Sequence, residues 1–124
     1  MFQTLFVLYL INAILLINHE IDSAYWKEWD LFNLPGGINL YLIIHFPLLF
    51  LVLYGLILVY NQSYAGLIVS LILCLGGLFA FFIHTYFIKK GRNEFKTLIS
   101  LFILVSTLIV SLIQGSITLY LMVL

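Results

Sequence analysis

Charged side chains are scarce in this sequence, and long stretches contain none. Only 8% of the 124 residues are Asp, Glu, Lys or Arg, against about 25% in ordinary soluble domains. The uncharged stretches 1–19, 31–88 and 97–124 are too long to be exposed to water, and a small soluble core could not bury them. This pattern excludes a soluble globular domain and is typical of an integral membrane protein.

Cysteine and net charge are also lacking. The single cysteine, Cys74, cannot form an intramolecular disulfide, and its apolar surroundings in the sequence predict a small core residue. Five basic and five acidic side chains give a formal net charge of zero, so the composition predicts no nucleic-acid partner. Because 65% of the residues are hydrophobic, the lipid bilayer is the expected partner, and homo-oligomerisation is left open.

The hydrophobic stretches predict an all-α, integral membrane four-helix bundle that forms a single domain over residues 1–124. A transmembrane helix needs about 20 apolar residues, so the stretch 31–88 must fold back once, at the polar turn 61–64. We expect spans at about 2–18, 38–60, 64–88 and 97–122. A short interfacial helix is expected at about 19–32, after the first span.

The charged side chains fall in two windows, 20–30 and 89–96, and two spans lie between these windows. Both windows therefore face the same side of the membrane. All five Lys and Arg residues lie on that side, and the positive-inside rule predicts that it is cytoplasmic. We expect a multi-pass protein of the cell inner (plasma) membrane, with both termini outside.

Small and polar residues recur along one face of the third and fourth spans. Helices associate in lipid through such residues, because close backbone approach and interhelical hydrogen bonds replace the hydrophobic effect there. The stripe of the third span comprises Gly66, Ser70, Cys74, Gly77, Phe81 and His84, and that of the fourth comprises Thr97, Ser100, Thr107, Ser111, Gln114 and Thr118. Both stripes are expected to face the bundle interior, where hydrogen bonds between helices are their simplest role.

The three histidines are expected at similar depth near the charged side. At 1.5 Å per helical residue, His45 lies about 10 Å inside the second span, His84 lies about 7 Å inside the third, and His19 ends the first. Ionisable residues in a membrane are costly and indicate function by default. The candidate polar site comprises His19, Glu20, Asp22, Glu28, His45 and His84. Since imidazole and carboxylate suit Zn, Fe or Mn, a divalent metal is the candidate cofactor, with His19, His45 and His84 as candidate ligands.

Three aromatic side chains accompany this candidate site. Tyr25, Trp26 and Trp29 could form the wall of a site for a lipid or a small apolar ligand, or could anchor an interfacial helix. Glu28 falls in the most apolar sector of that helix, so we expect it either to pair with a cation such as Arg92 or to have a raised pKa. The alternative interpretation of the histidines is that ordinary hydrogen bonds satisfy them.

The zinc-protease motif HExxH is absent, because Ser23 stands where the second histidine is required. The segment 18–29, NHEIDSAYWKEW, followed by Leu34-Pro35-Gly36-Gly37, resembles an uncharacterised family of small four-span bacterial membrane proteins. More distantly, His19-x-x-Asp22 is similar to the HXXEE group of multi-span proteins, although Asp22 and Ser23 replace its two glutamates. Neither resemblance implies a known reaction.

Three functions therefore compete. The first is a membrane protein with a histidine and carboxylate site at the cytosolic face that binds a metal or a lipid-like ligand, with or without catalysis. The second is a small-solute transporter or channel. Small multidrug transporters resemble this chain in length and span count, but they carry a glutamate midway along the first helix, where this chain has only Asn12. The third is an accessory membrane subunit without chemistry of its own.

Overall fold

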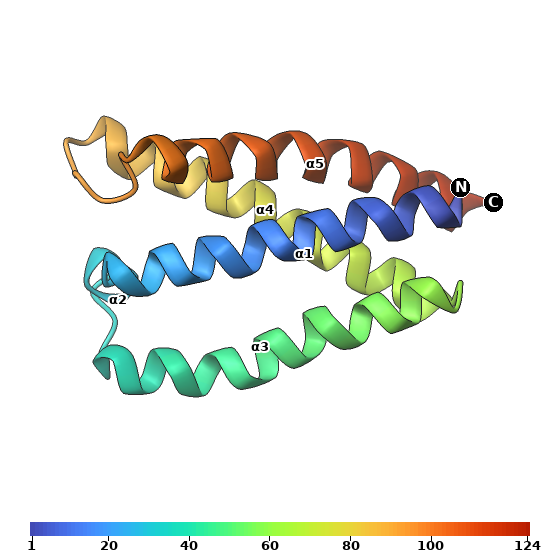
Figure 1. Ribbon diagram of the computed structural model, residues 1–124, viewed down its shortest axis with the longest axis horizontal. Coiled ribbons are helices and arrows are strands. Elements are labelled where there is room, and N and C mark those ends of the chain that lie inside the picture. Colours follow the sequence, from blue (N-terminus) through green and yellow to red (C-terminus); the bar gives the residue numbers. More distant parts are fainter.

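The computed structural model describes residues 1–124 and contains five helices and no strands. The helices are α1 (Phe2–Tyr25), α2 (Glu28–Leu31), α3 (Gly37–Tyr60), α4 (Tyr64–Lys89) and α5 (Leu98–Val123). All except α2 are long and apolar enough to cross a membrane. Figure 1 shows them side by side, with both termini at one end and α2 with the two charged windows at the other. The all-α fold with four apolar helices and one short extra helix is thereby confirmed.

The first long helix differs from the expected 2–18 span. It continues without interruption to Tyr25, so residues 19–25 belong to α1 and not to a separate interfacial helix at 19–32. The helix ends at Trp26, and Lys27 adopts a left-handed conformation with φ 54°. Such a conformation is uncommon outside glycine, and no glycine in the sequence marks this position. The separate helix expected at 19–32 is consequently reduced to α2, four residues long.

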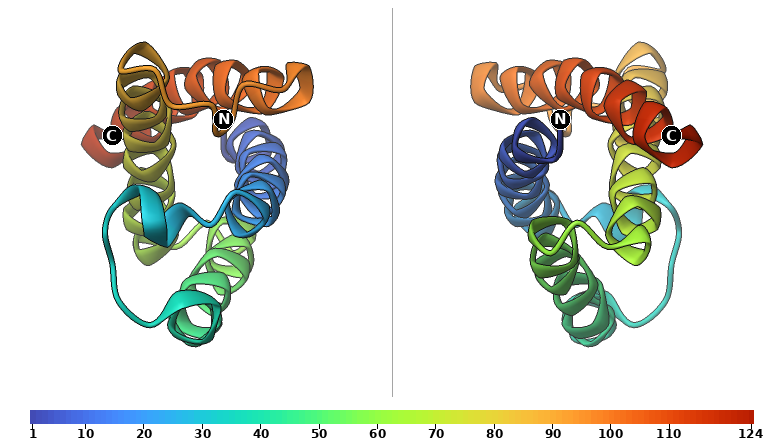
Figure 2. Two further views of the ribbon diagram at one scale, coloured as in Figure 1. Left: turned by 90° about the vertical axis from the view of Figure 1, so that its left-hand side faces the viewer. Right: turned by 90° about the vertical axis from the view of Figure 1, so that its right-hand side faces the viewer.

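The four long helices form a ring, in which α1 packs against α3 and α5, and α4 also packs against α3 and α5. Figure 2, seen along the helices, shows this ring and the detour of the chain through α2 into α3. The short α2 lies against α1 and α3. This arrangement places the last turns of α1 and α4 at the same end of the bundle as α2.

A ladder of hydrogen bonds runs through the buried interior between α1, α4 and α5. Asn12 Nδ2 donates to Ser111 Oγ at 3.1 Å and to Gln114 Oε1 at 2.9 Å. Gln114 Nε2 donates to Ser70 Oγ at 2.9 Å, and Ser70 bonds Thr118 at 2.8 Å. These groups satisfy one another, as helix association in lipid requires. The stripes predicted for the third and fourth spans face inward except for Phe81, which is half-buried, and Thr97, which is exposed and caps α5.

Only the second half of α3 is buried in the bundle. Its buried residues are Val52, Gly55 and Val59, and a hydrogen bond of 2.7 Å from Tyr9 Oη to the Val52 carbonyl ties this half to α1. Pro47 lies inside the helix, where it removes a backbone donor and favours a bend. The first half of α3 therefore stands away from the core and leaves space beside α1 and α2.

Candidate functional site

A cluster of two histidines and one glutamate lies where α1, α2 and α4 meet. His19 comes from the last turns of α1, Glu28 opens α2, and His84 comes from the last turns of α4. One ligand-type atom of each lies within 4.8 Å of the others. The imidazole centroids of His19 and His84 are 4.8 Å apart in an edge-to-face arrangement. The left-handed Lys27 makes this possible, because the chain turns there and Glu28 points back into the bundle.

Polar atoms of this cluster are buried and have no hydrogen-bond partner. His19 is 4% exposed and His84 1% exposed. His19 Nδ1, Glu28 Oε2 and both ring nitrogens of His84 lack partners. His84 Nε2 approaches Glu28 Oε1 at 3.6 Å, which is too long for a hydrogen bond. Buried polar groups are nearly always bonded in native proteins, and each exception calls for an explanation.

An apolar layer closes the cluster on the side of the connections from α1 to α3 and from α4 to α5. Phe95 is 1% exposed and forms a small core with Leu31 and Leu104. Its ring centroid lies 4.0 Å from that of His84 and 5.6 Å from that of His19. Phe95 adopts a φ of 66°, which is unusual for a bulky residue and indicates that packing holds it there. Phe95 is also the only hydrophobic residue between Lys89 and Thr97, a signal that could have revealed its role.

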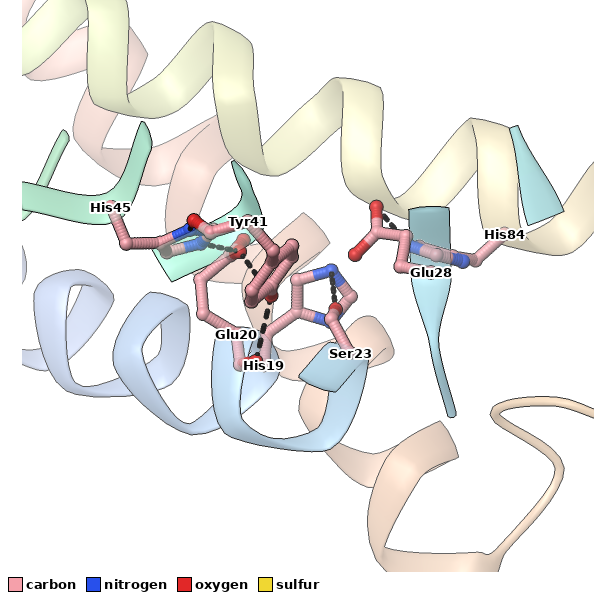
Figure 3. A network of polar contacts seen from close by, with 7 residues as sticks. All are labelled: His19, Glu20, Ser23, Glu28, Tyr41, His45 and His84. Carbon is pink, nitrogen blue, oxygen red and sulfur yellow. Dashed lines mark hydrogen bonds and ion pairs between the residues drawn. The ribbon is translucent and has the colours of Figure 1, made fainter. Parts of the chain in front are cut away.

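His45 is not part of this cluster, which differs from the expected set of three histidine ligands. Its Nε2 lies 2.5 Å from Glu20 Oε2, and its Nδ1 lies 2.6 Å from the Tyr41 carbonyl. Tyr41 Oη donates to the same Glu20 oxygen at 2.9 Å. These bonds occupy both nitrogens of His45 and join α1 to the first half of α3. Figure 3 shows the two groups, with Glu20, Tyr41 and His45 on one side and His19, Glu28 and His84 on the other.

The sequence predicts that Glu28 either pairs with a cation such as Arg92 or has a raised pKa. Glu28 does not pair with Arg92. Arg92 pairs with Glu94 at 2.7 Å instead, and the basic group beside Glu28 is His84, which lies within ion-pair distance but makes no hydrogen bond with it. The pKa of Glu28 is also not raised. Burial raises it, but the neighbouring His84 and Ser23 outweigh burial and hold the pKa of this carboxyl below its ordinary value. Glu28 is therefore ionised at neutral pH, in the form that a metal requires.

A cavity of about 200 Å³ adjoins the cluster and lies between α1, α2 and the first half of α3. Its lining comprises Glu20, Glu28, Trp29, Phe32, Leu34, Pro35, Gly37, Leu40, Tyr41, Ile44 and His45. Of the three aromatic residues expected to form a ligand wall, only Trp29 lines this cavity. Tyr25 and Trp26 line a separate, more polar depression beside Arg92. Asp22 belongs neither to the cluster nor to the cavity lining.

Sequence comparison adds a family but no activity. Neither the curated proteins nor the solved structures include a match to this chain. Residues 5–121 match one protein family, in agreement with the expected membership of an uncharacterised family, while the distant likeness to the HXXEE group stays a prediction. The chain belongs to the family described as "Family of unknown function (DUF6713)".

Proposed function

We propose that the protein is a membrane-embedded metal-binding protein in which His19, Glu28 and His84 hold one divalent transition-metal ion. The observation that carries the proposal is the group of buried, unpartnered ligand atoms on three separate helices. Burying a polar group without a partner costs about 1–3 kcal/mol. A bound cation offsets this cost for all three side chains at once.

The ligand chemistry favours zinc or ferrous iron over calcium or magnesium. The latter two take oxygen ligands almost exclusively, whereas two imidazoles and one carboxylate suit Zn, Fe or Mn. Tetrahedral ligands at about 2.0–2.2 Å from zinc stand roughly 3.4 Å apart, so the three side chains would draw together by about 1 Å on binding. Small rotamer changes of the three side chains would supply this movement.

Three protein ligands leave a coordination position open, as in catalytic and not structural zinc sites. A metal in this cluster would supply a Lewis acid or an activated water molecule beside the adjoining cavity. Glu28 lies at the boundary, because it belongs to the cluster and also lines the cavity. The arrangement therefore supports a metal that meets a bound molecule, and it fits an accessory subunit without chemistry less well.

Metal analysis of purified protein tests the proposal. We expect about one zinc or iron per chain in protein purified without chelator, and a large loss of metal in His84→Ala and Glu28→Gln. His45→Ala is the matched control, because His45 lies outside the cluster and should leave the metal content unchanged. His84→Gln serves as a second variant that retains a polar side chain. The proposal would be refuted if wild-type protein bound neither zinc nor ferrous iron after reconstitution with each metal.

The orientation of the site follows from the charged windows. We propose that the end with α2 faces the cytosol of a cell inner (plasma) membrane, because all five Lys and Arg residues lie at that end. Cysteine labelling in a Cys74→Ser background tests this. Cysteine at Asn61 should react with an impermeant reagent from outside and cysteine at Asn93 only after permeabilisation, and the reverse pattern would invert the topology.

A further inference from the structure

The cavity beside the cluster has a mostly apolar lining that includes two glutamates. Its body is formed by aromatic and aliphatic side chains of α2, of the connection to α3 and of α3 itself, including Trp29, Phe32 and Ile44. Glu20 and Glu28 also belong to the lining. Figure 3 shows both carboxyl groups in the space between α1, α3 and α4. A molecule with an apolar body and a small polar group therefore suits this lining.

The cavity is reached from the side of the bundle that faces lipid. No residue in the first half of α3 is buried. Leu40 and Ile44 line the cavity while 38% and 50% exposed, so one wall of the cavity is also outer surface. Because α3 is one of the helices able to cross a membrane, this outer surface meets acyl chains. The occupant can enter sideways from the bilayer.

The charge of the lining restricts the head of the occupant. Two carboxyl groups and His45 are the ionisable side chains that could meet a head group, apart from Tyr41, and neither Lys nor Arg lines the cavity. An anionic head such as a phosphate or a carboxylate would be repelled by Glu28 and would find no guanidinium or ammonium partner. A hydroxyl head can donate to a carboxylate oxygen.

The size of the cavity restricts the tail. At about 200 Å³ it is smaller than the roughly 300–1,000 Å³ of sites for drug-sized ligands. It therefore accommodates part of one hydrocarbon chain, and a second tail would have to remain in the bilayer. We propose that this cavity binds a single-chain amphiphile from the membrane, with an alcohol head directed at Glu28. The proposal stands on the cavity lining alone and does not require the metal.

Fluorescence quenching of Trp29 tests binding directly. The chain has two tryptophans, so Trp26→Phe leaves Trp29 as the only reporter. The protein is reconstituted in phosphatidylcholine vesicles and titrated with a long-chain alcohol brominated along its tail, because bromine quenches tryptophan on contact. The sulfate ester of the same alcohol is the anionic comparison. Should Trp26→Phe reduce folding, the difference between wild type and Trp29→Phe gives the same signal.

Two variants of α3 separate the cavity from the general lipid surface. Ile44→Phe fills the cavity, whereas Ile43→Phe changes a residue that is 62% exposed and does not line it. We expect saturable quenching by the alcohol in Ile43→Phe, and an apparent affinity about tenfold weaker in Ile44→Phe, with no saturable component for the sulfate. Identical curves for the two variants, or equal quenching by alcohol and sulfate, would overturn the proposal. The metal content of the same samples reports separately on the metal site, so that either idea can fail alone.

Discussion

The close approach of α4 and α5 at Gly77 yields the sharpest stability prediction. A Cβ atom at Gly77 would overlap Ser111 Oγ and would lie 2.9 Å from Thr107 Cγ2 and 3.3 Å from Ser111 Cβ. Carbon atoms pack best at about 3.5–4.0 Å, so α5 would have to move or Ser111 would have to leave its bond with Asn12. Overpacking of this kind costs about 1–3 kcal/mol. Gly77→Ala should therefore lower stability by about this amount, and Gly77→Leu by more.

The neighbouring glycine provides a matched control for this prediction. A Cβ atom at Gly76 would meet nothing within 4 Å, so Gly76→Ala and Gly76→Leu should be tolerated. Thermal unfolding in detergent, followed by circular dichroism, should show a drop of several degrees in apparent Tm for Gly77→Ala and almost none for Gly76→Ala. Equal Tm values for the two alanine variants would refute the inward orientation of Gly77 and with it the packing of α4 on α5.

Two further predictions concern buried polar groups. Gln114→Leu removes the centre of the ladder and should cost about 1 kcal/mol, at the level of intramembrane hydrogen bonds, whereas Ser116→Ala on the exposed face of α5, where the hydroxyl bonds only the Leu112 carbonyl, should be neutral in the same unfolding assay. The pKa of Glu28 is lowered on folding, so its contribution to stability is fully present above the unfolded-state value of about 4.3 and is lost as the pH falls through the folded-state value. In metal-free protein, the fall in apparent Tm below about pH 4.3 should therefore be larger for wild type than for Glu28→Gln.

Helix identity could be predicted from the sequence, but one helix end could not. Hydropathy predicts where a helix leaves the hydrocarbon region of the membrane, and for the first span it predicts a point near Asn18. The backbone hydrogen bonds of α1 nevertheless continue to Tyr25, because polar residues remain helical once the helix has formed. The actual break depends on the left-handed Lys27, and a lysine carries no local preference for that conformation.

The site could be predicted only where a helix has a polar face. The small-residue stripe of α4 indicated the inward direction of His84, and Asn12, seven residues before His19, lies on the same face of its helix as His19. The α3 helix is apolar on all sides, so no stripe specified how His45 is turned. Its ring faces Glu20, and the structure alone shows that Tyr41, one helical turn earlier, completes that group. The buried position of Phe95 depends on how the loop between α4 and α5 folds. Helical periodicity does not extend into that loop, so it could not predict this position.

The contrast between the two polar regions of this bundle is the strongest argument for a function. In the ladder around Gln114, donors and acceptors from three helices satisfy one another in the middle of the apolar region. Four of the six unpartnered buried side-chain atoms in the chain instead belong to the cluster of His19, Glu28 and His84. Each unpaired buried group in the cluster costs about 1–3 kcal/mol. Since the buried polar groups of the ladder are paired, we expect the cost in the cluster to be compensated as well. A cation held by these three side chains supplies that compensation, and Glu28, which also faces the cavity, is where it would act on a bound molecule.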